Sequence, residues 1–337
     1  MDDMVGRRHE GWGEGEGVEF EFRGAPQPFP YQGSKRRIAP RILRHLPKSV
    51  PRLVEPFAGS AALSIAVAGR RGASRYWIND AHEPLAALWS EILDRPEELA
   101  DRYAFLWNDQ DGRERRYFDE VRKRFNRAHD PADLLYLLAR CVKAAVRYNS
   151  SGEFNNTPDN RRRGARPSEM RRRLLGVSGL LGGRTRVTSR DYLEVLRRCS
   201  ASDLVYMDPP YQGVCRSRDQ RYSPGIDHDL FCDALADLTS RGIMFAVSYD
   251  GRTGRKRFGA DLPESLGLVR LEIRAGRSTQ ATLLGRRDVT YESLYLSPAL
   301  VEAGAGSEPR ASGLQLENRD DSARYVPGLS AGTLPPK

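Results

Sequence analysis

The sequence predicts an α/β fold with a mostly parallel, twisted sheet. Short apolar segments of strand length alternate with segments whose apolar residues recur at helical spacing, which is typical of strands joined by crossover helices. Two predicted strands end in Gly- or Pro-containing turns: residues 53–55 lead into Pro56-Phe57-Ala58-Gly59, and residues 204–207 lead into Asp208-Pro209-Pro210-Tyr211. The 337 residues are enough for one large domain and a smaller one.

The elements can be placed in chain order. Residues 1–24 are rich in Gly, Glu and Arg without periodicity, and we expect them to be disordered. Residues 36–46 predict a helix after the Gly33-Ser34 turn. The predicted strands lie at 52–56, 75–79, 185–188, 203–207, 243–248, 268–274 and 290–297. Further helices are predicted at 60–69, 83–93 and 229–240, and a disordered tail at 301–337.

A long basic segment separates the second and third predicted strands. Residues 96–147 predict several helices, for example from Ala132 to Val146, and residues 148–183 are polar with loop signals. Residues 111–190 hold 20 Lys and Arg against nine Asp and Glu, while the whole chain has a net charge of +9. Such an excess suits a polyanionic partner, although it is also typical of a solvated face. Its position between the two turns favours DNA.

Composition argues against several other classes. The four cysteines form no C-x-x-C pair, which predicts reduced thiols in a cytosolic setting. The five histidines form no H-E-x-x-H motif, so we expect no metal site. No apolar run reaches 18 residues and no signal-peptide pattern is present, so we expect a soluble, cytoplasmic protein with no membrane partner.

The stretch Asp208-Pro209-Pro210-Tyr211 places a carboxylate, proline carbonyls and an aromatic ring at the carboxyl end of a buried strand. Two prolines cannot extend the hydrogen-bond ladder, so the strand stops and these groups are held stiffly. Ligands bind at this end of the strands in open α/β sheets. The carboxylate and a carbonyl could accept hydrogen bonds from the amino group of a nucleobase, on which the ring could stack. The alternative is an acidic turn after a strand.

A second pattern predicts a nucleoside pocket. Glu55-Pro56-Phe57-Ala58-Gly59-Ser60 lies between a strand and a helix, and Gly59 lets the backbone approach a ligand. Asp80 follows the next strand, about 20 positions later, where an acidic residue commonly binds ribose hydroxyls. The segment contains neither G-x-G-x-x-G nor a Walker loop. Each piece alone could be ordinary α/β scaffolding, but together they favour a nucleoside ligand.

With these motifs in this order, the chain resembles the Dam-type (class alpha) adenine-specific DNA methyltransferases. The resemblance covers roughly residues 27–298 and rests also on Tyr31-Gln32-Gly33-Ser34-Lys35 and on Arg147-Tyr148-Asn149-Ser150-Ser151-Gly152-Glu153-Phe154-Asn155. It implies a Rossmann-like methyltransferase fold, S-adenosylmethionine as methyl donor without a metal, and the N6 amino group of adenine in double-stranded DNA as acceptor. The adenine would be flipped out of the duplex and stacked on Tyr211.

The resemblance also implies a division of the chain. A catalytic domain is expected at 25–95 and 184–300, and an inserted, mainly helical and basic target-recognition domain at 96–183. Such a protein would be prokaryotic and nucleoid-associated. It would be either a solitary methylase or the modification enzyme of a restriction-modification system, so a restriction endonuclease acting on the same site stays open as a partner.

Residue roles carry over by position. The resemblance implies that the catalytic residues are Asp208, Pro209 and Tyr211. It implies cofactor contacts for Tyr31, Lys35, Phe57, Gly59, Asp80, Asp191 and Asp208. DNA contacts are expected by resemblance from Arg147, Asn149 and Asn155, and by charge from Arg171, Arg172 and Arg173. Two departures are Ala61, where many members have a second glycine, and residues 156–160, which replace a short Pro-containing turn.

Two alternatives stay open. A ribosomal-RNA methyltransferase acting on a base amino group can carry the same Asp-Pro-Pro-Tyr sequence, but the long basic insertion and residues 31–35 favour DNA. A catalytically silent nucleic-acid-binding protein could share the fold, and the intact motif at 208–211 argues against it.

Overall fold

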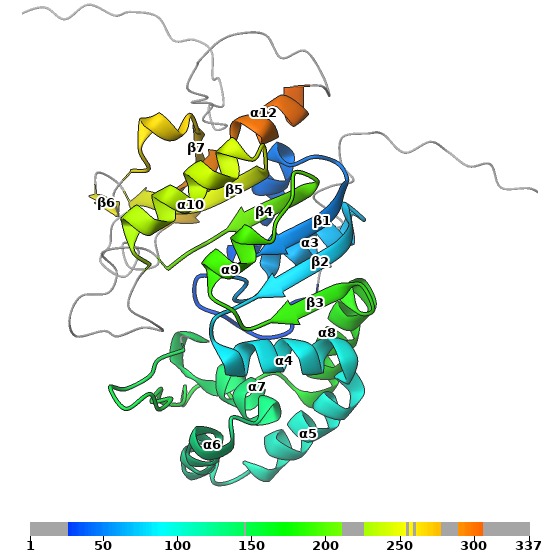
Figure 1. Ribbon diagram of the computed structural model, residues 1–337. Helices are drawn as coiled ribbons and strands as arrows, with labels where there is room; N and C mark the ends of the chain where they lie inside the picture. Colours follow the sequence, from blue (N-terminus) through cyan, green and yellow to red (C-terminus); the bar gives the residue numbers. More distant parts are fainter. Residues whose placement is uncertain are drawn as a thin grey trace, which may run out of the picture.

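The computed structural model describes residues 26–144, 146–210, 226–253, 256–258, 261–277 and 289–305 (Figure 1). Residues 1–24, Tyr211 of the proposed catalytic motif and residues 306–337 of the expected tail lie outside this part of the chain. A central sheet with helices packed around it makes up the described part.

The strands form one sheet in the order β3-β2-β1-β4-β5-β8-β7, with β6 paired to β5. They are β1 (Val50–Glu55), β2 (Ala73–Asn79), β3 (Thr185–Thr188), β4 (Asp203–Met207), β5 (Met244–Thr253), β6 (Lys256–Phe258), β7 (Val269–Arg277) and β8 (Val289–Leu296). The five strands from β3 to β5 along this order are parallel to one another, and β8 and β7 are antiparallel additions at one edge. The predicted mostly parallel sheet is therefore confirmed.

Some helices cover the sheet, and others form a separate group beyond one of its edges. In chain order they are η1 (Lys35–Arg37), α2 (Ala39–Ile42), η2 (Leu43–His45), α3 (Ala62–Gly69), α4 (Glu83–Asp94), α5 (Pro96–Asp109), α6 (Glu114–Ala128), α7 (Pro131–Arg140), η3 (Val142–Ala144), α8 (Pro167–Leu181), α9 (Tyr192–Arg197), α10 (His228–Ser240), η4 (Glu264–Leu266) and α12 (Pro298–Ala305). In Figure 1, helices α4 to α8 gather beyond the β3 edge, while α9 and α10 lie over one face of the sheet.

Both faces of the sheet are buried. Successive side chains of a strand point to opposite faces, so neighbouring residues pack into two different apolar clusters. Leu53 and Leu204 join the apolar cluster that includes α3, whereas their neighbours Val54 and Val205 join a second cluster with α9 and α10. A strand covered on both sides is apolar at most positions, which explains the run from Leu204 to Met207 in β4.

The helices beyond β3 share a core with the sheet. The cluster that contains Leu53 of β1 also contains Phe118 and Phe125 of α6 and Leu134 of α7. One continuous apolar core therefore runs from the sheet into the helical region. The division of the chain at residues 96 and 183 into catalytic and target-recognition domains stays a prediction.

Two predicted helices are wrong in extent. Residues 36–46 form three short turns instead of one helix, since Pro40 has no N–H to donate to the carbonyl four residues earlier. The helix expected at 132–146 ends at Arg140, because Cys141 is extended and forms an isolated bridge with the segment that returns along it.

Two segments predicted as loop or tail contain helices. Helix α8 lies within residues 148–183, and its buried residues Met170, Leu174, Val177 and Leu181 recur at helical spacing. The run of three arginines beside them obscured this pattern. Helix α12 extends to Ala305, so residues 301–305 of the expected tail are ordered.

Candidate active site at the carboxyl end of the sheet

The strand order reverses between β1 and β4. The chain moves outward from β1 to β2 and β3, then returns to pair β4 with the other side of β1. In open α/β sheets, ligands bind at such a switch point, beyond the carboxyl ends of the strands. Glu55 is the last residue of β1, and Asp208 immediately follows β4. Both proposed motifs therefore reach the same edge of the sheet, at the switch point.

Lys35 joins the N-terminal motif to the catalytic motif. It opens the short helix η1, whose cap is Ser34, and its side chain is only 5% exposed. The Lys35 ammonium lies 3.0 Å from Asp208 Oδ1 and 3.1 Å from Glu292 Oε2 on β8. One buried cation is thus shared by two carboxylates from different strands.

Burial sets the electrostatics of Asp208. Loss of solvent raises the pKa of the Asp208 carboxyl to about 6, against a lowering by the Lys35 ammonium and a further rise from the Glu292 charge. Burial likewise raises the pKa of Glu55 to about 7, although its Oε1 accepts a hydrogen bond of 2.7 Å from the Ser64 amide. At neutral pH the Asp208 carboxylate is therefore ionised and available as an acceptor.

At Gly59, in the turn after β1, the backbone lies directly against the Tyr31 ring. Its φ is +49°, and a Cβ at this position would lie 2.9 Å from Cε1 of the Tyr31 ring. Its carbonyl accepts a hydrogen bond of 2.8 Å from the Trp89 indole. The absence of a side chain therefore lets Tyr31 pack directly on the turn.

Ala61 stands where many members of the family have a second glycine, and its backbone has a conformation typical of glycine. It has φ +45° and ψ +40°, the left-handed conformation that normally favours glycine. The turn therefore keeps a glycine-like conformation although its second glycine is replaced by alanine.

Asp80 is tied to the Gly59 turn. Its Oδ2 accepts a hydrogen bond of 2.9 Å from the Gly59 amide, and its Oδ1 accepts one of 3.0 Å from the His82 amide. Burial raises the pKa of the Asp80 carboxyl against these two hydrogen bonds. A carboxylate positioned by backbone amides beside a glycine turn is an acceptor suited to a pair of hydroxyl groups.

Aromatic rings line the next part of the crevice. The Phe57 ring lies 5.0 Å from the Tyr192 ring, between centroids, at the start of α9. Asp191 caps this helix, because its Oδ1 accepts a hydrogen bond of 2.8 Å from the Leu193 amide. The structure thus brings the Phe57 and Asp191 positions together, and it shows that the Asp191 carboxylate also serves as a helix cap.

Residues 147–155 form a hairpin with a structured tip. Asn149 Oδ1 accepts hydrogen bonds from the Ser151 and Glu153 amides, and the Asn155 amide donates to the Arg147 carbonyl. The structure therefore gives Asn149 a turn-forming role, in addition to the DNA contact expected of it, and leaves the Asn155 side chain exposed.

The hairpin is attached to the segment that follows Asp80. The Tyr148 hydroxyl is hydrogen-bonded to His82 Nε2, and the His82 amide is one of the two groups held by Asp80. Burial lowers the pKa of His82 to about 4, so its ring is neutral at pH 7. Nothing in the sequence indicates this link, because a histidine before a helix is a common structural feature.

The three arginines of α8 are paired with carboxylates. Arg171 contacts Asp101, and both Arg172 and Arg173 contact Glu169. Their side chains are 39%, 68% and 31% exposed, so they face solvent and also form ion pairs. The structure does not place them in the crevice around Asp208, and their contact with DNA stays a prediction.

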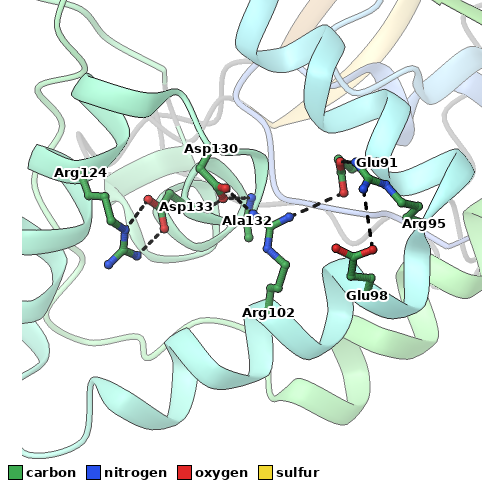
Figure 2. A network of polar contacts seen from close by, with 8 residues as sticks. All are labelled: Glu91, Arg95, Glu98, Arg102, Arg124, Asp130, Ala132 and Asp133. Carbon is green, nitrogen blue, oxygen red and sulfur yellow. Dashed lines mark hydrogen bonds and ion pairs between the residues drawn. The ribbon is translucent and has the colours of Figure 1, made fainter.

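The same pairing recurs among the neighbouring helices. Figure 2 shows Arg102 between Glu91 and Asp130, and Arg124 in a two-pronged contact with Asp133. Much of the positive charge of the helical region is thus locally compensated. The bare count of basic residues therefore overstates the charge available to a polyanion.

Among the residues that the structure describes, no group of three or more His, Cys, Asp and Glu is arranged to hold a metal ion. None of the described helices is both long and apolar enough to cross a membrane.

Comparison with known proteins identifies the family. A model of the family described as D12 class N6 adenine-specific DNA methyltransferase matches residues 31–271, and the chain belongs to this family. Membership confirms the resemblance expected from the motifs. Together with the strand order, it also confirms the predicted Rossmann-like methyltransferase fold.

Several relatives are similar over long segments. The chain is 28% identical over 236 residues to a DNA N-6-adenine-methyltransferase of Escherichia phage P1, covering 66% of this chain and 29% of that protein. It is 30% identical over 190 residues to the Retron Ec67 DNA adenine methylase of Escherichia coli, covering 55% and 63%. It is 25% identical over 282 residues to a DNA adenine methylase of Vibrio cholerae, covering 80% and 95%. The chain thus spans less than two thirds of the phage and retron proteins.

Proposed function

We propose that this chain transfers a methyl group from S-adenosylmethionine to the N6 amino group of adenine at a specific site in double-stranded DNA. The observation that carries the proposal is the Asp208 carboxylate, held at the switch point of the sheet and 3.0 Å from the Lys35 ammonium. Family membership implies both the methyl donor and the DNA substrate.

The residues around the Gly59 turn fit the donor. Gly59 has no side chain that would displace the Tyr31 ring from the turn. Asp80 supplies a carboxylate, held by two backbone amides, for the ribose hydroxyls. The Phe57 and Tyr192 rings could flank a planar base. S-adenosylmethionine carries an already activated methyl group, so the protein must supply only binding and positioning.

The task of the catalytic motif is to position a weak nucleophile. The lone pair of the adenine amino nitrogen is delocalised into the ring. Asp208 and the Pro209 carbonyl could accept its two N–H bonds, which would turn the nitrogen toward tetrahedral geometry and free the lone pair. The ionised Asp208 carboxylate is the stronger acceptor of the two. Tyr211 would stack on the flipped base, as the motif predicts.

The test is methyl incorporation from tritiated S-adenosylmethionine into duplex DNA, followed by nucleoside chromatography. Wild-type protein should yield N6-methyladenine without added metal, and Asp208→Ala should abolish the product while DNA binding persists, because most affinity comes from phosphate contacts elsewhere. Tyr211→Ala should be severe and Tyr211→Phe mild, since stacking needs the ring. Asp237→Asn, an exposed carboxylate of α10 paired with Arg241, is the matched control.

Other products would overturn the proposal in distinct ways. Methylcytosine would exclude the adenine assignment, and methylation of ribosomal RNA instead of duplex DNA would favour the RNA alternative. DNA binding without methyl transfer would support the silent binding protein. Sequencing of modified bases in a plasmid from expressing cells would give the recognition site and show whether a restriction endonuclease of the same specificity is worth seeking.

A further inference from the structure

Glu292 belongs to none of the motifs and lies beyond residue 271, where the family match ends. Its carboxylate nevertheless reaches the centre of the site. Glu292 Oε2 lies 3.1 Å from the Lys35 ammonium, and the same ammonium lies 3.0 Å from Asp208 Oδ1. The Glu292 side chain is 22% exposed, equal to that of Asp208.

The sheet places Glu292 beside uncharged neighbours. In the register of β8, Glu292 pairs with Ile273 of β7 on one side and with Gly251 of β5 on the other. A Cβ at Gly251 would meet the Tyr291 carbonyl at 2.6 Å, and the β5 register shifts between Ser248 and Gly251. Strand β7 therefore places an apolar side chain, Ile273, beside Glu292. Strand β5 places a glycine there, which has no side chain.

The charged groups of the cluster come from four different elements. Lys35 comes from η1, Asp208 from the end of β4, Glu292 from β8, and Glu55 from the end of β1. Burial is the main cause of the raised pKa values of Asp208 and Glu55, and neighbouring charges add to it: the Glu292 charge raises the pKa of Asp208, and the Asp208 charge raises that of Glu55. Two carboxylates thus contact the Lys35 ammonium, and a third, Glu55, interacts with one of them.

This sharing bears on how Asp208 could take a substrate. A lysine held by Asp208 alone would form a tight charge-assisted contact and compete with the adenine amino group for the carboxylate. A second carboxylate on the same ammonium weakens that competition, because the lysine keeps a partner when Asp208 turns to the base. A neutral acceptor at this position would hold the ammonium more weakly than a carboxylate does.

We propose that Glu292 is a positioning residue that holds the Lys35 ammonium, so that Asp208 can exchange this contact for the amino group of the target base. The inference rests on the proposed adenine methyl transfer. The competing explanation is that Glu292 only ties β8 to η1, in which case its charge would affect stability and not the behaviour of Asp208.

The decisive variant is Glu292→Gln, which keeps the size of the side chain and removes its charge. Its kcat should fall at least about tenfold at pH 8, because a neutral amide oxygen holds the Lys35 ammonium less strongly than a carboxylate and Lys35 then binds Asp208 more tightly, with KM for DNA within about twofold of wild type. The acidic limb of the kcat profile should move down by about one pH unit, since a like charge next to Asp208 is gone. Glu292→Asp keeps the charge, so the acidic limb of its kcat–pH profile should lie close to that of the wild type.

Glu272→Gln is the matched control, because Glu272 lies on the neighbouring strand β7 and pairs with Arg252. It should leave both kcat and the profile unchanged. A Glu292→Gln protein that is folded and has wild-type kcat and acidic limb would overturn the proposal. Equal losses in Glu292→Gln and Glu292→Asp, with an unmoved limb, would also overturn it in favour of a structural tie.

A second measurement separates this inference from the proposed function. Carbon-13 NMR of the Asp208 carboxyl, assigned with Asp208→Asn, follows its titration without any substrate. The midpoint should lie near the pKa of about 6 in the wild type and lower in Glu292→Gln. An unchanged midpoint refutes the charge effect of Glu292. Absence of methyl transfer by wild-type protein refutes the proposed function alone, and the titration still decides the role of Glu292.

Discussion

Replacing Asp208 by asparagine should stabilise the folded protein while abolishing methyl transfer. The Asp208 carboxylate is charged at neutral pH in a buried position, and its pKa is raised from 3.8 to about 6. Asparagine has nearly the same shape and carries no charge to desolvate. The protein therefore bears a cost in stability for keeping an ionised acceptor at this point, and Asp208→Asn should remove it.

The size of the gain follows from the pKa shift. A rise of about two pH units corresponds to about 3 kcal/mol of unfolding free energy above pH 7, as an order of magnitude. Because the folded-state pKa is the higher one, the folded protein binds the proton more tightly than the unfolded chain. The cost of Asp208 is therefore absent below about pH 4, grows between about pH 4 and 6, and is complete above about pH 7.

Urea denaturation of wild type, Asp208→Asn and the surface control Asp237→Asn at pH 8 and pH 4.5 measures this. The gain from Asp208→Asn should be largest at pH 8 and much smaller at pH 4.5, and Asp237→Asn should show no comparable difference. A destabilised Asp208→Asn at pH 8, or a gain of the same size at both pH values, would refute the electrostatic reasoning. The m-value should be unchanged, because the exposed surface on unfolding is the same.

Three further outcomes are expected. Asp80→Asn should weaken S-adenosylmethionine binding by about 1.5–3 kcal/mol in calorimetry, through the loss of a charged acceptor, and unchanged affinity in a folded variant would remove Asp80 from the site. Neutralising residues 171–173 should flatten the salt dependence of DNA binding by up to about 0.9 log-log units per lost phosphate contact, and an identical slope in anisotropy titrations would leave them as a solvated face. Asp203→Ala should cost about 3–5 kcal/mol in urea denaturation, since Asp203 is 2% exposed and takes two hydrogen bonds from Arg52; a loss below about 1 kcal/mol would contradict this.

Features that depend on neighbouring residues could be predicted from the sequence. The strands β1, β2 and β4 are short and largely apolar, β1 and β4 end in Gly or Pro turns and β2 ends before Asp80, and their carboxyl ends meet because the strands are parallel. For this reason the sequence alone predicts Gly59, Asp80 and Asp208 at one edge of the sheet. The Gly59–Asp80 hydrogen bond follows from the same geometry.

Contacts set by long-range register could not be predicted. Glu292 reaches Lys35 only because β8 inserts antiparallel between β5 and β7, and a strand pattern does not reveal which lysine will face it. The ion pair of Arg171 with Asp101 likewise joins residues of two different helices. The conformation of Ala61 was hidden for a different reason: alanine rarely adopts a positive φ, so the residue type argued against the turn it forms.

Two of the buried carboxylates elsewhere in the sheet and helices are held differently from those at the carboxyl ends of the parallel strands. Away from the crevice, Asp133 and Asp203 each meet a forked arginine, Arg124 and Arg52, in the pairing that best compensates a desolvated charge. At the carboxyl ends of three adjacent parallel strands the pattern changes. Glu55 and Asp80 are held by backbone amides, Asp208 shares one ammonium with Glu292, and burial raises the pKa of all three. Forked arginines would make these carboxylates stable but unavailable, whereas amides and a shared lysine leave them as acceptors that can exchange partners. This contrast is the physical reason to assign chemistry to this edge of the sheet and structure to the other pairs.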